Sequence, residues 1–71
     1  MSFPERLKEL RQGKNLSQIA LAKDLGVSSR NYQRYEYGEI EAPISVGVAL
    51  ADFFNVSLDY LVGRSDNPQR L

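Results

Sequence analysis

Two arginines, a glutamine and a serine lie close together in the chain, at Ser29, Arg30, Gln33 and Arg34. Arginine can donate two parallel hydrogen bonds to guanine, glutamine can pair in the same way with adenine, and serine can bond several base edges. A helical repeat of 3.6 residues would gather these four side chains on one face. Arginines on an isolated helix are more often solvated surface, so the chemistry depends on the elements around them.

The same segment carries a second set of residues at helical spacing. Tyr32, Tyr35 and Glu36 fall opposite the arginines, whereas Tyr37 falls near them. Tyrosines in such a stripe favour core packing over a stacking platform for single-stranded nucleic acid. The pattern predicts a two-sided helix over residues 28–37, with its polar face outward.

A shorter helix is predicted immediately ahead of it, over residues 18–25. Ser17 can cap this helix, and Leu21 and Leu25 lie four residues apart on one face. Gly26 can adopt the left-handed conformation that ends a helix, and Ser28 can cap the next one. Two short helices joined by so tight a turn form a helix-turn-helix unit.

Three further helices are expected around this unit. Ser2 and Glu5 form a capping-box pattern ahead of a helix over residues 4–12. An apolar run after Pro43 predicts a buried helix over residues 44–54, and Ser57 precedes a short helix over residues 58–62. We therefore expect an all-α fold of five helices in one domain, residues 1–63, with a frayed polar tail at 64–71.

Composition excludes several functional classes. The chain has no cysteine and no histidine, which removes disulfides, thiolate nucleophiles, the commonest general base and the usual zinc ligands. We expect no enzyme, no metal, no cofactor and, in so small a domain, no small-molecule ligand. The absence of a signal peptide or of a long apolar run predicts a cytoplasmic protein with no membrane partner.

Charge is unevenly distributed along the chain. Formal net charge is zero, but residues 1–35 contain seven basic and three acidic residues, and residues 36–71 contain two basic and six acidic ones. Such asymmetry predicts that the first half faces a polyanion, although ordinary solvated surface charge would give the same count.

These positions together resemble the helix-turn-helix pattern of the Xre and Cro/CI-type phage repressor family. The resemblance spans roughly residues 6–62 and rests on Gln18, Leu21, Ala22, Leu25, Gly26, Val27, Tyr32 and Tyr35, extended by Glu36, Gly38, Leu50, Ala51, Phe54, Val56, Ser57 and Leu61. It implies a lambda-repressor-like fold. Tyr32, Tyr37 and Pro43 depart from the usual family pattern.

The resemblance also implies roles for individual residues. Base contacts would fall on Ser29, Arg30 and Arg34, with Gln33 as a further candidate. Contacts to the DNA backbone would come from Gln18 and its neighbours, through amides at the start of the second helix and with help from Ser17. Ser28 is a further DNA-binding residue, and Tyr37 stands where the family often has an asparagine that contacts phosphate. Arg11 and Glu36 would form a structural ion pair that does not touch DNA.

The predicted function is sequence-specific binding of double-stranded DNA by a transcriptional regulator, with repression favoured. A homodimer would bind inverted half-sites about 34 Å apart. Part of the apolar set at Phe53, Phe54, Leu58, Tyr60 and Leu61 would form its two-fold contact, although a full core would account for the same residues equally well. The competing hypothesis is a protein-interaction module such as an antitoxin, which the acidic second half favours.

Overall fold

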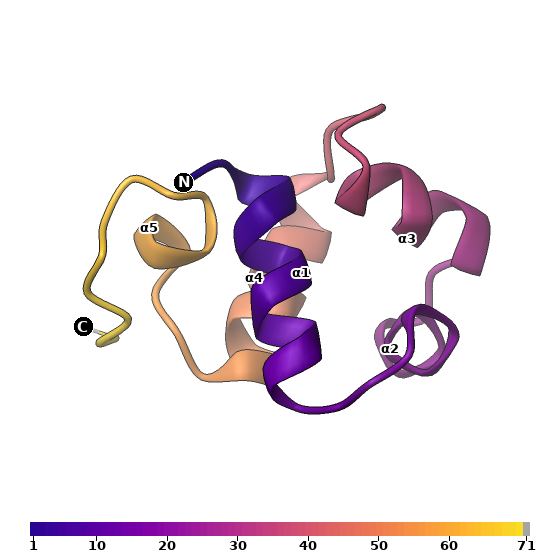
Figure 1. Cartoon of the computed structure of the whole chain (residues 1–71), viewed down its shortest axis with the longest axis horizontal. Coiled ribbons are helices and arrows are strands. Elements are labelled where there is room, and N and C mark those ends of the chain that lie inside the picture. Colours follow the sequence, from indigo (N-terminus) through magenta and orange to yellow (C-terminus); the bar gives the residue numbers. More distant parts are fainter. Residues whose placement is uncertain (71) are drawn as a thin grey trace.

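A computed structural model describes residues 1–70 and contains five α-helices and no strand among them. The helices are α1 (Phe3–Gly13), α2 (Gln18–Leu25), α3 (Ser29–Glu36), α4 (Ile44–Phe54) and α5 (Leu58–Leu61). Figure 1 shows α1 and α4 in the middle, α2 and α3 on one side, and α5 with the C-terminal segment on the other. The predicted all-α class is confirmed, and no described helix is long and apolar enough to cross a membrane.

Serine side chains begin four of the five helices. Ser2 forms the capping box with Glu5, and Ser17, Ser28 and Ser57 each accept a hydrogen bond from an amide three residues ahead. These bonds satisfy amides that would otherwise lack a partner at a helix start. The predicted bounds hold for α2 and α4, and elsewhere the ends differ by one residue.

The core draws at least one large side chain from every helix. Leu7, Leu21, Tyr32, Leu50 and Leu61 are fully buried. Ala22 is also buried on α2, a helix that packs against both α3 and α4. The helix-turn-helix unit is thus fixed to the rest of the domain by one continuous core.

The expectation that α4 is a buried helix is wrong for one of its faces. Leu50, Ala51 and Phe54 enter the core, but Ile44 is 84% exposed and Val48 is 42% exposed. The apolar set that sequence analysis offers for a two-fold contact is divided in the same way. Phe54 and Leu61 are buried, Phe53 and Tyr60 are partly buried, and Leu58 is exposed. The contact itself stays a prediction. A continuous apolar run could not show which of its members would find a partner.

The C-terminal segment is folded back onto the domain, so the predicted fraying is wrong for residues 64–70; Leu71 lies outside the described residues. The Ser57 amide donates to the Pro68 carbonyl at 3.0 Å, and Arg70 donates to the Ala51 carbonyl at 3.2 Å and to Asp52 at 2.6 Å. The polar composition of the segment did not reveal these partners, because they come from distant parts of the chain.

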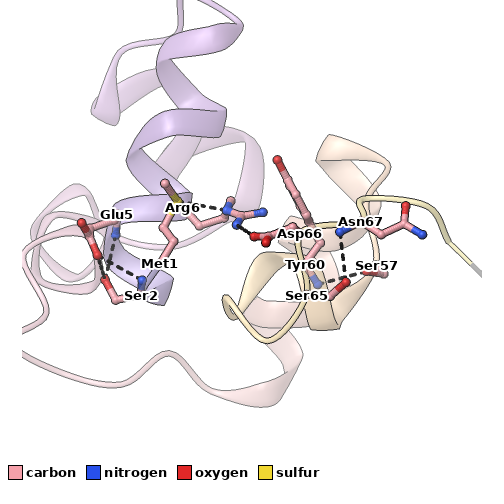
Figure 2. A network of polar contacts seen from close by, with 9 residues as sticks. All are labelled: Met1, Ser2, Glu5, Arg6, Ser57, Tyr60, Ser65, Asp66 and Asn67. Carbon is pink, nitrogen blue, oxygen red and sulfur yellow. Dashed lines mark hydrogen bonds and ion pairs between the residues drawn. The ribbon is translucent and has the colours of Figure 1, made fainter.

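Arg6 lies at the junction between this segment and α1, as Figure 2 shows. Its guanidinium stacks 3.6 Å from the centre of the Tyr60 ring, its Nε faces the Met1 sulfur at 3.1 Å, and its Nη2 lies 3.6 Å from Asp66. The side chain is only 4% exposed, and Nη1 has no hydrogen-bond partner among the described residues. Arg6 is therefore a buried cation with weak partners.

Candidate nucleic-acid interface

Helix α3 has one buried and one accessible side. Tyr32, Tyr35 and Glu36 are buried against the packed side, where α3 contacts α1 and α2. Ser29 and Arg30 are exposed, and Gln33 and Arg34 are partly exposed. The accessible side therefore carries the four groups that sequence analysis predicts to contact bases.

A shallow hollow is formed on this accessible side. It is lined by Arg30, Gln33, Arg34, Tyr37 and Glu39, and we call it the recognition hollow. Tyr37 is the C-cap of α3, and its ring is 66% exposed. The structure therefore brings Tyr37 together with three predicted base-contacting residues, while Ser29 stands apart at the start of the helix.

Glu39 belongs to this hollow but was missed by sequence analysis. Gly38 has a φ of 73°, and the turn places the Glu39 amide 2.9 Å from the Arg34 carbonyl. The Gly38 amide also donates to Tyr35, which completes a Schellman motif at the end of α3. The glycine at the helix end was the signal that could have identified Glu39, because a Schellman motif places the residue after the glycine next to the last turn of the helix.

The expected Arg11 and Glu36 ion pair is present beneath α3. Arg11 Nε and Nη2 donate to the two Glu36 carboxylate oxygens, both at 2.9 Å, and Nη1 donates to the Leu16 carbonyl at 2.7 Å. The Glu36 side chain is 1% exposed and that of Arg11 is 12% exposed. The pair thus joins α1, the following loop and α3 inside the domain.

Hydrogen bonding outweighs burial in setting the charge state of Glu36. Burial alone would raise the pKa of this carboxyl, but the hydrogen bonds from Arg11 and Gln18, together with the nearby Tyr32 hydroxyl, lower the pKa below its usual value. The pKa of Arg11 is raised, chiefly by its hydrogen bonds to Glu36. Both groups are therefore held in their charged forms.

Tyr32 closes the apolar side of this network. Burial, and then the adjacent Glu36 carboxylate, raise the pKa of its hydroxyl. The hydroxyl oxygen lies beside Glu36, but within residues 1–70 it meets no partner at good hydrogen-bond geometry. Tyr32 stays neutral and acts mainly as a core side chain.

Gln18 is positioned by the same carboxylate. Its side-chain amide donates a hydrogen bond to Glu36 Oε1 at 3.2 Å. A residue predicted to contact the DNA backbone therefore also links α2 to α3. The backbone amides of Gln18 and Ile19 precede the first intrahelical bond of α2, which Leu21 donates to the Ser17 carbonyl at 3.1 Å. These leading amides are the groups that can bind an anion at a helix start.

The basic first half offers less surface charge than its sequence suggests. Arg6 is 3% exposed, and Arg11 is bound to Glu36. Lys14, Lys23 and Arg30 remain exposed. The charge count alone could not separate arginines used inside the domain from those on its surface.

The helix-turn-helix family pattern matches residues 7–61 of this chain. The chain belongs to the helix-turn-helix family. This match covers α2, α3 and the ion pair between Arg11 and Glu36, and the five-helix architecture agrees with the lambda-repressor-like fold of Xre and Cro/CI-type members.

Curated members of the helix-turn-helix family share about a third of the sequence. The chain is 34% identical over 66 residues to the HTH-type transcriptional regulator YobD of Bacillus subtilis, covering 93% of this chain and 59% of YobD. It is 36% identical over 73 residues to the cryptic phage CTXphi transcriptional repressor RstR of Vibrio cholerae, covering 100% of this chain and 65% of RstR. It is 37% identical over 62 residues to the transcriptional activator BcrR of Enterococcus faecalis, covering 87% of this chain and 30% of BcrR.

This chain thus spans less than two thirds of the length of these three relatives.

Proposed function

We propose that this domain binds double-stranded DNA in a sequence-specific manner by placing α3 in the major groove. The observation that carries the proposal is the recognition hollow, where Arg30, Gln33 and Arg34 share the accessible side of a helix whose other side is buried. The major groove of DNA admits one α-helix, and these side chains match the hydrogen-bonding groups of guanine and adenine. Ser29, at the start of α3, is a fourth base-contacting residue.

Contacts to the DNA backbone would set the position of α3. The leading amides of α2 and the Gln18 side chain lie at one end of the helix-turn-helix unit, and Tyr37 lies at the other. The side-chain oxygens of Ser17 and Ser28 accept hydrogen bonds from backbone amides in the first turns of α2 and α3. Their hydroxyl groups can still donate a hydrogen bond to a phosphate oxygen.

The biological role that fits this binding is transcriptional regulation, with repression as the favoured direction. A DNA-bound domain can repress by occupying a promoter, whereas activation requires an additional productive contact with the transcription machinery. Relatives are named for both directions, as repressor RstR and as activator BcrR. A reporter assay with the selected DNA site upstream of or overlapping a promoter separates the two.

Two copies of the chain would contact each other through an exposed apolar face and together bind an inverted repeat of DNA. Ile44, Leu58 and Val62 are exposed and line an apolar groove between the start of α1, the loop after α3, α4 and α5. Pairing of two copies would bury these exposed apolar side chains, and a two-fold axis lets the same face serve both copies. Glu39 lines both this groove and the recognition hollow, so the two-fold axis would lie close to α3.

Selection of bound sequences from random duplex DNA tests the binding proposal. The wild-type protein should enrich one motif, arranged as an inverted repeat. Arg30→Ala and Arg34→Ala should each remove about 1–3 kcal/mol of discrimination at one base pair and leave the melting temperature unchanged. Retention of the full base preference in both variants would contradict the assigned face.

Sedimentation equilibrium tests the dimer. Ile44→Glu should shift the protein toward monomer, because a charge would be buried at the contact. Ile19→Glu is the matched control, since Ile19 is an exposed apolar residue on α2, outside the groove. Equal effects of the two variants would refute the proposed contact.

A second candidate function is a protein-interaction module such as an antitoxin. The apolar groove favours it, because Glu39 and Glu41 line that groove and would attract a basic partner segment. Absence of any enriched DNA motif, together with groove-dependent binding of a basic amphipathic peptide, would promote this candidate over the first.

A further inference from the structure

We infer that Glu39 is a specificity-determining residue, which holds the guanidinium of Arg34 in the orientation that pairs with guanine. The inference rests on the proposed function, in which α3 contacts base edges. Arg34 Nε lies 3.7 Å from Glu39 Oε2, and both side chains line the recognition hollow. Within residues 1–70, Glu39 is the one acidic residue that lines that hollow.

The backbone fixes where the Glu39 side chain begins. Gly38 takes the left-handed conformation, and the Glu39 amide donates to the Arg34 carbonyl at 2.9 Å. A residue with a β-carbon is strained at that φ, so the turn depends on the glycine. The backbones of Arg34 and Glu39 are therefore joined by a hydrogen bond. This bond keeps the two side chains close enough for the carboxylate to lie near the guanidinium.

The contacted atom decides which part of Arg34 stays available. A guanidinium carries five N–H donors in a rigid planar fork. The Glu39 carboxylate lies nearest to Nε, at an ion-pair distance that is longer than a hydrogen bond. The edge formed by Nη1 and Nη2 stays available to donate two parallel bonds to guanine O6 and N7. Glu39 thus favours that edge of the fork for DNA.

Two physical effects of Glu39 act in the same direction. A held arginine loses less side-chain entropy when it binds its base, which favours the correct site. The carboxylate also repels DNA phosphates, which weakens the non-specific binding that depends on charge alone. The side chains of Arg34 and Glu39 are 41% and 58% exposed, so their ion pair contributes little to folding. Its effect should appear in discrimination between sequences.

Glu39→Gln tests this inference, with Glu9→Gln as the matched control. Both residues are exposed and the changes remove the same charge, but Glu9 lies on α1 and lines neither the recognition hollow nor the apolar groove. Affinities are measured for the selected site, for the site with the Arg34-dependent guanine replaced, and for unrelated duplex DNA. All three are measured over a range of salt concentrations.

Glu39→Gln should lower discrimination at that guanine by about three- to tenfold, a fraction of what a bidentate contact provides, while strengthening non-specific binding. Glu9→Gln should leave discrimination unchanged. In an Arg34→Ala background, Glu39→Gln should have no further effect on discrimination, and its melting temperature should match that of the parent.

Three outcomes would overturn the inference: unchanged discrimination in Glu39→Gln, an equal loss in Glu9→Gln, or a loss that persists without Arg34. If the wild-type protein itself shows no preference among sequences, the proposed function fails, and the inference fails with it. If the wild-type protein is sequence-selective and Glu39→Gln keeps the same selectivity, only the inference is overturned and the proposed function stands.

Discussion

Replacing Glu36 with alanine should severely destabilise the domain. The change removes both acceptors of Arg11 at 2.9 Å and leaves a guanidinium that is 12% exposed with only the Leu16 carbonyl as partner. Breaking a buried pair in this way costs about 3–5 kcal/mol. A domain of 71 residues has a total stability of roughly 4–10 kcal/mol, so the variant should lose about half of it.

Thermal unfolding followed by circular dichroism measures this loss. At about 4–8 °C per kcal/mol for a domain of this size, the melting temperature should fall by roughly 15–30 °C. The double variant Arg11→Met/Glu36→Leu is the control, because it leaves no unpaired charge and should lose less than Glu36→Ala alone. A Glu36→Ala protein that melts within about 3 °C of wild type would refute the buried-pair reasoning.

Three further predictions concern acid stability, the turn at Gly63 and the buried Arg6. The pKa of Glu36 is lower in the folded protein than in the unfolded chain, so its stabilisation is present above the ordinary glutamate pKa and is lost as pH falls through the lowered pKa. Glu36→Gln should flatten that acid limb in pH-dependent urea titrations, and an unchanged limb would contradict the assignment. Gly63→Ala should lower the free energy of unfolding by at least about 1 kcal/mol, because φ is 84° and a β-carbon would overlap the Met1 carbonyl oxygen. Gly13→Ala is the control in the same melting assay and should be tolerated, because a β-carbon there meets open space. Arg6→Met removes a weakly compensated cation and should keep the free energy of unfolding within about 1 kcal/mol of wild type. Hydrogen exchange at the Ser57 amide should accelerate, because residues 64–70 would pack less firmly. A loss of several kcal/mol of unfolding free energy would show instead that Arg6 is well compensated.

Local chemistry made the helices and their order predictable. Ser17, Ser28 and Gly26 act within a few residues of their own positions, and the structure shows each in the capping or turning role that its type favours. The inward side of α3 was also predictable, because Tyr32 and Tyr35 repeat at helical spacing and both are buried. These features depend on short-range hydrogen bonds and on periodicity, which a sequence displays directly.

Partners distant along the chain were not predictable in the same way. Arg6 and Arg30 look alike in the sequence, but only the packed structure brings the Tyr60 ring over Arg6 and leaves Arg30 exposed. The apolar residues of α4 likewise divide between core and surface according to where neighbouring helices cross.

For DNA binding, the sequence by itself determined a helix-turn-helix whose second helix carries Arg30, Gln33 and Arg34 on one face. The family resemblance already implied the pair of Arg11 and Glu36, which the structure confirms. Only the tertiary structure decided that Gln18 also donates to Glu36 and that Glu39 lies beside Arg34. The physical reason is that a charged side chain takes its role from the groups that surround it after folding. Those groups come from separate helices and loops.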